Sequence, residues 1–252
     1  LILDTAANAT AVEFMAEKIR GIVKDPATAE KLIPKTYPIG AKRLCVDTGY
    51  YATFNRENVT LVDIGQEPIA DITAAGVKTG VREYEVDAIV YAIGFDAMTG
   101  ALSKIDIRGR GGRKLSDAWA AGPRTYLGLM VAGFPNLFTV TGPGSPSVLC
   151  NMAVAIEQHV EWISDCITWM GERQAGAIEA TEPAQDAWVE HVNEVADTTI
   201  YPLANSWYLG ANVPGKPRVF MPYIGGFPVY RDKCNEVAAN GYEGFTVEAG
   251  GR

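Results

Sequence analysis

Two adjacent cations, Lys42 and Arg43, stand in the loop "GAKR", directly before the segment "LCVD". The arginine guanidinium offers a rigid fork of donors, and the lysine ammonium offers a compact point charge. Such a pair could hold the phosphate of a cofactor and an anionic intermediate. Adjacent basic residues at the edge of a strand are more often simply solvated, so both interpretations stay open at this point.

The stretch "TVTGPGSPSVLCNMAVAIEQHVEW", residues 139–162, predicts a strand, a glycine–proline turn and a helix. The N–H groups and positive dipole end at a helix start favour a phosphate or an electron-rich ring. Gly142 and Gly144 fit the first places of the dinucleotide fingerprint G-x-G-x-x-G, but Ser147 stands in the third. Asp165 falls in mid-helix, so it cannot be the ribose-binding acid. A plain turn and a ligand site remain alternatives.

Other residues with chemical potential carry weaker signals. Trp207 lies in the loop "NSWYLGANVPGK", where packing is the more common role and ligand contact the alternative. His159, on the expected helix, is interpreted as a surface or packing residue rather than a base. Ser145 and Ser147 lack the His/Asp partners and the G-x-S-x-G context of a nucleophile.

Composition restricts the function further. The chain has 252 residues and a net charge of −8, which argues against a nucleic-acid surface or a polybasic membrane patch. Four cysteines without C-x-x-C spacing and only two histidines predict no metal site, and favour reduced thiols in the cytoplasm. The apolar runs are shorter than a membrane span requires, so we expect no membrane partner.

The elements that must position these residues are of mixed type. Helices are expected at about 10–33 with a break at "DPAT", after the glycine turn, at about 184–198 and near 231–239. A hairpin is expected at "ADITAAGVKTG", and strands at "RLCVD", "VTLVDI", "EYEVDAIVYAIGF", "TYLGLMV" and "NLFTVT". Helices mixed with strands predict an α/β protein.

Longer strings of sequence resemble one family. "VDAIVYAIGFDAMTGAL" resembles the D-x-x-x-x-A-x-G-[FY] segment of flavin-dependent monooxygenases. "WAAGPRTYLGLMVAGFPNLF", "GPGSPSVLCNM", "IEQHVEWI" and "SWYLGANVPGKPRVFMPYIGGF" resemble the C-terminal half of type I Baeyer–Villiger monooxygenases, nearest to the phenylacetone and steroid group. The resemblance covers essentially the whole chain. It implies FAD and NADPH as cofactors, and insertion of one oxygen of O2 beside a ketone carbonyl to give an ester or lactone.

The resemblance also implies roles for individual residues. Arg43 is similar to the family's active-site arginine, which stabilises developing negative charge, and Lys42 to the residue that pairs with the 2′-phosphate of NADPH. Trp207 is similar to the tryptophan at the nicotinamide ribose. Met152 falls where the backbone meets the flavin ring, beside the turn of Gly142 and Gly144. Three residues match the loop that lines the ketone pocket: Ser147, Val148 and Leu149.

The departures from the family concern what precedes these strings. Both dinucleotide fingerprints and the F-x-G-x-x-x-H-x-x-x-W-P stretch are missing, so the chain is expected to match roughly the last half of such an enzyme and to be inactive alone. Residues 1–38 would end a helical insertion, residues 39–88 would return to the NADP domain, and residues 89–252 would complete the FAD domain. A related flavin-containing or N-hydroxylating monooxygenase and a non-catalytic binding module remain as alternatives. The sequence leaves the ketone and the oligomeric state undetermined.

Overall fold

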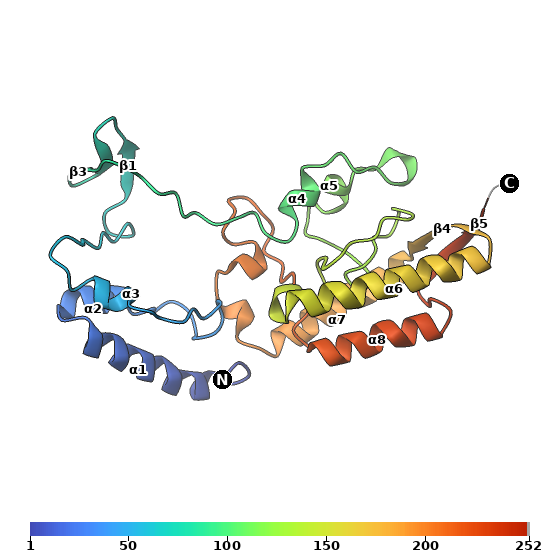
Figure 1. The fold of residues 1–252 in the computed structure, drawn as a ribbon, viewed down its shortest axis with the longest axis horizontal. Coiled ribbons are helices and arrows are strands. Elements are labelled where there is room, and N and C mark those ends of the chain that lie inside the picture. Colours follow the sequence, from blue (N-terminus) through green and yellow to red (C-terminus); the bar gives the residue numbers. More distant parts are fainter. Residues whose placement is uncertain (251–252) are drawn as a thin grey trace. The chain divides into compact units, whose positions relative to one another are not determined.

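The computed structural model describes residues 1–250 and divides the chain into two compact units (Figure 1). The first unit comprises Leu1–Gly94, and the second begins at Phe95. Each unit has its own buried apolar residues. The expected assignment of residues 1–38, 39–88 and 89–252 to cofactor domains remains a prediction.

The first unit is built on two helices, α1 (Thr5–Ile22) and α2 (Pro26–Leu32). Asp4 begins α1 by accepting the N–H of Ala7 at 2.8 Å. Asp25 caps α2 and Pro26 opens it, which places the break at the expected "DPAT". The helices bury a small apolar cluster made of Ala16, Ile19, Val23, Ala29 and Ile33.

The rest of the first unit contains the short helix α3 (Tyr50–Thr53) and one antiparallel sheet. Its strands are β1 (Ile69–Ile72), β2 (Gly76–Thr79) and β3 (Glu83–Glu85), paired in that order. The expected hairpin is therefore confirmed.

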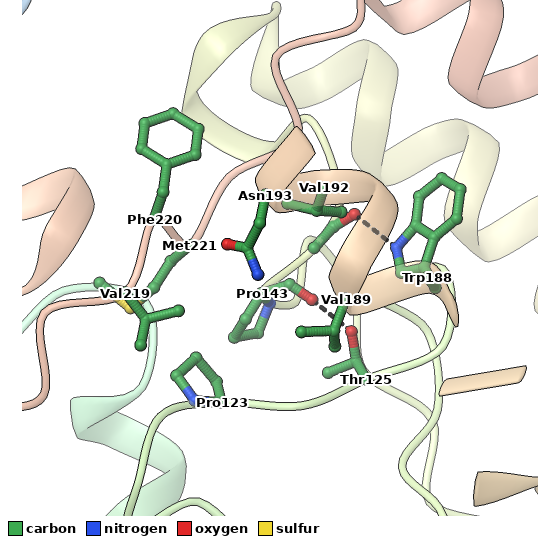
Figure 2. A pocket seen from close by; sticks show the side chains of 11 residues that line it. Pro123, Thr125, Pro143, Trp188, Val189, Val192, Asn193, Val219, Phe220 and Met221 are labelled. Atoms are coloured by element: carbon green, nitrogen blue, oxygen red, sulfur yellow. Dashed lines mark hydrogen bonds between the residues drawn. The ribbon is translucent and has the colours of Figure 1, made fainter. Parts of the chain in front are cut away.

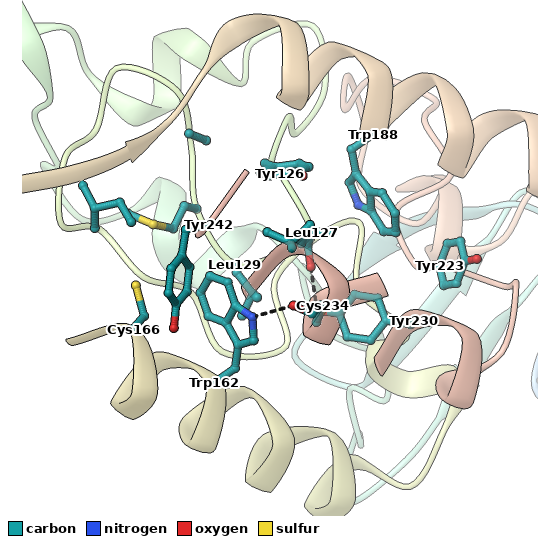
Figure 3. Close-up of a cluster of buried hydrophobic side chains, with 14 of the residues drawn as sticks. Tyr126, Leu127, Leu129, Trp162, Cys166, Trp188, Tyr223, Tyr230, Cys234 and Tyr242 are labelled. Carbon is teal, nitrogen blue, oxygen red and sulfur yellow. Dashed lines mark hydrogen bonds between the residues drawn. The ribbon is translucent and has the colours of Figure 1, made fainter. Parts of the chain in front are cut away.

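The second unit packs helices against a two-stranded sheet. Helix α6 (Met152–Glu172) packs against α8 (Phe227–Ala239), and Trp162 Nε1 donates to the carbonyl of Cys234 at 3.0 Å (Figures 1 and 3). Helix α7 (Glu182–Asp197) confirms the expected third helix. The antiparallel strands are β4 (Ala175–Ala180) and β5 (Phe245–Ala249). The buried cluster includes Tyr126, Leu127, Leu129, Met130, Trp162, Cys166, Ile178, Trp188, Tyr223, Tyr230, Cys234 and Tyr242.

Short helices occupy much of the remaining chain of this unit. They are α4 (Gly100–Ser103), η1 (Arg110–Gly112), α5 (Leu115–Ala118), η2 (Ser147–Leu149), η3 (Tyr201–Leu203) and η4 (Trp207–Leu209).

Most of the expected single strands are wrong. Residues 43–47 and 59–64 form no regular strand, and of "EYEVDAIVYAIGF" only Glu83–Glu85 pairs. "TYLGLMV" and "NLFTVT" form only isolated bridges through Met130. An apolar, β-branched run becomes a strand only when a neighbour takes up its backbone hydrogen bonds. Residues 87–94 have no such neighbour within the described chain, and Val90 is 88% exposed.

The observed mixture of helices and sheets agrees with the expected α/β class. Among residues 1–250 every sheet is antiparallel, so the described chain contains no βαβ unit of the kind that holds a dinucleotide. None of the described helices combines the length and apolarity that crossing a membrane requires.

Helix α6 has an exposed apolar stripe beside its buried face. Ile156, Val160 and Ile167 lie four and seven residues apart, which places them on one side of the helix. They are 41%, 48% and 55% exposed. This stripe in the second unit and the unpaired run 87–94 in the first each expose apolar side chains that favour association.

We therefore expect the 252-residue chain by itself to self-associate, and the double substitution Val160→Lys with Ile167→Lys to reduce this. The matched control is Glu161→Gln with Thr168→Lys, which changes the net charge by the same +2 on a polar side of α6. Size-exclusion chromatography should show a later, narrower peak for the first variant only. Equal shifts in both variants would attribute association to charge and not to the stripe.

Candidate functional site

The glycine–proline turn before α6 is held by hydrogen bonds to every carbonyl from residue 142 to 145. Side chains and backbone from three other segments provide most of the donors, and Figure 2 shows two of these bonds. The donors are Ser145 Oγ to Gly142 at 2.7 Å, Thr125 Oγ1 to Pro143 at 2.5 Å, Trp188 Nε1 to Gly144 at 3.0 Å and Tyr223 N to Ser145 at 2.7 Å. A turn with its carbonyls satisfied in this way is rigid, because releasing it would leave buried polar groups unpaired.

The two glycines of this turn are explained by close packing within the protein. A Cβ on Gly142 would lie 2.5 Å from the carbonyl oxygen of Gly128 and 2.6 Å from Thr139 Oγ1. Gly144 has φ +86°, and a Cβ there would lie 2.9 Å from Thr125 Oγ1. Glycine at both places is therefore required whether or not a ligand is bound.

A cavity of about 400 Å³ lies beside this turn and brings together most of the residues singled out in the second unit. Gly142, Ser147, Val148, Met152 and Trp207 all line it. They come from the turn, from η2, from the first residue of α6 and from η4. The sequence places these residues up to 65 positions apart, and the fold gathers them around one space.

Two of the predicted residues lie elsewhere. Gly144 faces a separate cavity of about 20 Å³, next to Trp188 (Figure 2). Leu149 packs against a buried cluster that contains Tyr208 and Phe220. Their proposed contacts with cofactor and ketone stay predictions.

Three cavity-lining residues that are not glycine adopt positive φ. Met98, Thr141 and Ser147 have φ of 68°, 52° and 45°. Ser147 Oγ also donates to the sulfur of Met98 at 3.7 Å. Such conformations are costly for residues with a Cβ and persist where the surroundings hold them, which is common at ligand sites. Met98 and Thr141 could not be identified from the sequence, because the type of these residues does not indicate a positive φ.

The start of α6 faces the same cavity. Asn151 caps the helix by accepting the N–H of Ala153 at 3.1 Å, and Met152 is 37% exposed. The first turn of a helix has N–H groups without intrahelical acceptors and carries the positive end of the dipole. The cavity therefore combines an apolar lining with a side that favours electron-rich atoms.

A strap of hydrogen bonds holds the wall that contains Met98. Lys216 Nζ donates to Asp96 Oδ1 at 2.6 Å and to the carbonyl of Ala97 at 3.0 Å, and Asn212 Nδ2 donates to the carbonyl of Phe95 at 2.7 Å. The Lys216 side chain is only 13% exposed. The loop after Trp207 is thereby fixed to residues 95–97.

Lys42 and Arg43 lie in the first unit and line a cavity of about 530 Å³ between α1 and the loop that leads to α3. The ammonium of Lys42 stands over the ring of Tyr37, 4.3 Å from its centroid. Arg43 is exposed and takes part in interactions of its own. Both cations therefore border a space large enough for a ligand.

The loop that carries this pair is anchored by a buried asparagine that the sequence did not reveal. Asn8, on α1, is 2% exposed. Its Nδ2 donates to the carbonyl of Ile39 at 2.8 Å, and its Oδ1 accepts the N–H of Ile39 at 3.0 Å. Ala41, next along the loop, is completely buried. The backbone is thus fixed directly before Lys42.

Other chemistry has little support among the described residues. Within residues 1–250 no group of three His, Cys, Asp or Glu side chains is arranged to hold a metal ion. The four cysteines form no disulfide. Burial raises the pKa of the Cys150 thiol, near the cavity, which disfavours its thiolate.

The sequence and structure of this chain are similar to those of several known monooxygenases. No family model matches. The acetone monooxygenase (methyl acetate-forming) of Gordonia sp. (strain TY-5) and a Baeyer–Villiger monooxygenase of Pseudooceanicola batsensis are each 44% identical to this chain, over 93% and 94% of it. The structure of an oxidized steroid monooxygenase bound to NADP superposes with a TM-score of 0.91 and 53% identity, over 99% of this chain.

The chain matches the C-terminal half of Baeyer–Villiger monooxygenases. It spans less than half of these proteins, namely 44%, 43% and 47% of their lengths. A phenazine N-monooxygenase of Lysobacter antibioticus is similar to nearly the same degree, with 42% identity over 99% of this chain and 46% of its own length. The resemblance stated from the sequence is confirmed.

The Asn8 anchor generates a test that does not depend on any activity. In the full-length protein, Asn8→Ala should lower the free energy of unfolding by about 2–3 kcal/mol, since it leaves both backbone groups of Ile39 unpaired. It should also speed tryptic cleavage after Lys42 and Arg43. The matched control is Asn55→Ala, which removes two similar bonds, to Lys24 and Ile22, at the other end of α1. Equally fast cleavage in both variants would show that Asn8 does not fix this loop specifically.

Proposed function

We propose that this chain forms the C-terminal part of an FAD- and NADPH-dependent Baeyer–Villiger monooxygenase. Such an enzyme inserts one oxygen of O2 next to a ketone carbonyl and gives an ester or lactone. The observation that carries the proposal is the convergence of Gly142, Ser147, Val148, Met152 and Trp207 on one cavity at the start of α6. A cytoplasmic location fits the unpaired cysteines.

The cavity fits the ring end of a flavin better than a whole dinucleotide. Its lining is mostly apolar, as a planar aromatic ring requires, and the start of α6 suits the electron-rich side of a reduced ring. The sheets described in residues 1–250 supply no βαβ turn for the pyrophosphate. Bound FAD would supply the redox chemistry of the reaction.

The chain's own residues would position and stabilise the reactants. Arg43 is proposed as the fixed cation that stabilises negative charge developing on the ketone oxygen. Lys42 would hold the 2′-phosphate of NADPH, and Trp207 would pack at its nicotinamide ribose. Ser147, Val148 and Leu149 would shape the ketone pocket. In this assignment residues 39–88 belong to the NADP domain and residues 89–252 to the FAD domain, with 1–38 ending the helical insertion.

A second candidate function is N-oxidation, which the similarity to the phenazine N-monooxygenase favours. In that case a nucleophilic nitrogen of the substrate would accept the oxygen atom, instead of a ketone into which the oxygen is inserted beside the carbonyl. Product analysis of the full-length protein with a cyclic ketone and with an aromatic N-heterocycle separates the two. A lactone from the ketone supports the first proposal, and an N-oxide without lactone supports the second. A protein that binds neither FAD nor NADPH would be a non-catalytic module.

In the full-length protein, Arg43→Ala should abolish ester or lactone formation while NADPH still reduces the flavin. The cation is needed after reduction, when negative charge develops during oxygen insertion. Stopped-flow absorbance would follow flavin reduction, and gas chromatography would follow the product. Arg56→Ala, which removes another arginine of the same unit, is the control and should leave both unchanged. Normal product yield from Arg43→Ala would refute the role assigned to Arg43.

Lys42→Ala should weaken NADPH much more than NADH. One charge-assisted contact to a phosphate contributes about 1.5–3 kcal/mol, or roughly one to two decades in affinity. The measurement is kcat/KM for each nucleotide, with Lys35→Ala as the control, because Lys35 pairs with Glu30 on α2. An unchanged ratio between the nucleotides would move phosphate recognition to other residues.

A further inference from the structure

Thr141 lines the floor of the cavity in a backbone conformation that threonine rarely adopts. Thr141 has φ +52° and lies between the chain segment at 138–140 and Gly142. Its N–H donates to Nδ1 of His159 at 2.8 Å. Because β-branched residues rarely adopt positive φ, an external contact must hold this one. The imidazole of His159 is that contact.

His159 is fully buried on α6, so it is not the surface residue that was one of its two expected roles. It lies seven residues after Met152, two helical turns or about 10 Å along the axis. The same rigid helix therefore carries the residue that lines the cavity and the residue that holds the turn. The hydrogen bond from Thr141 fixes the turn relative to the start of α6.

The partners of His159 select one protonation state. Nδ1 accepts a backbone N–H, so it carries no proton. Nε2 lies 2.8 Å from the hydroxyl oxygen of Tyr230, and that hydroxyl donates to the carbonyl of Leu127 at 2.6 Å (Figure 3). Nε2 must therefore carry the proton and donate it to Tyr230. Only the neutral Nε2–H tautomer satisfies all three bonds.

The surroundings keep both side chains in these states. Burial lowers the pKa of His159 to about 4, so the imidazole is neutral near pH 7. Burial also raises the pKa of Tyr230 well above its usual value, so its hydroxyl keeps the proton that it donates. The chain Thr141–His159–Tyr230–Leu127 thus links the turn, α6, α8 and the loop at residue 127.

We propose that His159 and Tyr230 are positioning residues that hold the floor of the cavity at Thr141 in the place needed for a flavin ring. This inference rests on the proposed function, since it takes the flavin ring as the occupant of the cavity. The required state is the neutral Nε2–H imidazole. A positively charged or apolar side chain at position 159 leaves the Thr141 N–H without an acceptor, and the strained turn is then free to relax.

The test uses the full-length protein, from which bound FAD is removed and to which FAD is returned by titration. His159→Phe removes both bonds, whereas His159→Asn keeps an acceptor near the place of Nδ1. Cys166→Ala is the control, since Cys166 is fully buried on the same helix, two turns or about 10 Å beyond His159. The readouts are the Kd of FAD and the visible absorption spectrum of the bound flavin.

We expect His159→Phe to weaken FAD about tenfold, the equivalent of about 1.4 kcal/mol, and to shift the bound spectrum toward that of free flavin. His159→Asn should stay near the unmodified protein, and Cys166→Ala should lower only the melting temperature. If His159→Phe does not fold, Tyr230→Phe is tested in its place, because it removes the hydroxyl but keeps the aromatic ring. The Kd of FAD and the spectrum of the bound flavin are then measured on that variant.

Each contrary outcome has a definite meaning. Unchanged Kd and spectrum in His159→Phe, or in Tyr230→Phe where that variant decides, overturn this inference while the proposed function stands. An Asn variant as defective as the Phe variant also overturns it, because the acceptor would then be irrelevant. Failure of the unmodified protein to bind FAD overturns the proposed function and this inference together.

Discussion

The candidate site depends on one constraint, which is that the turn at residues 141–145 cannot move without breaking buried hydrogen bonds. Its carbonyls accept donors from the loop at 125, from α7 and from residue 223, and its first N–H is held by α6. These elements form one apolar core. Apolar packing stabilises this core but does not by itself set the direction of the backbone. The buried hydrogen bonds do, because they are satisfied in only one arrangement of the turn.

The two units fix the backbone beside their candidate ligand-binding residues in different ways. In the first unit a single buried amide, Asn8, fixes the loop before Lys42 and Arg43. In the second unit a network fixes the turn, and the Lys216–Asp96 strap fixes the opposite wall. In both units some residues that would meet a ligand, such as Arg43 and Met152, are exposed. The supports Asn8 and His159 are buried. Rigid supports of this kind allow a charge or a ring face to act without reorganisation.

Local signals in the sequence predicted the longer helices, because caps such as Asp25 and the 3.6-residue period are properties of short segments. The single strands were predicted wrongly, since residues 87–94 are strand-like in type but have no neighbour to pair with in the described chain. The site residues Met152 and Trp207 came from resemblance and not from physics. The supports, His159 for the turn and Asn8 for the loop before Lys42, depend on contacts 18 and 31 residues away, and a linear pattern does not encode such contacts.

The central claim is that this chain holds only the ring end of a flavin. The most direct measurement is absorbance near the flavin band after size-exclusion chromatography, for the 252-residue chain and for the full-length protein in parallel. The account predicts a yellow full-length protein with one FAD per chain, and a colourless 252-residue chain. A yellow, monomeric and cooperatively melting 252-residue chain would contradict it, because these residues would then hold the whole dinucleotide by themselves.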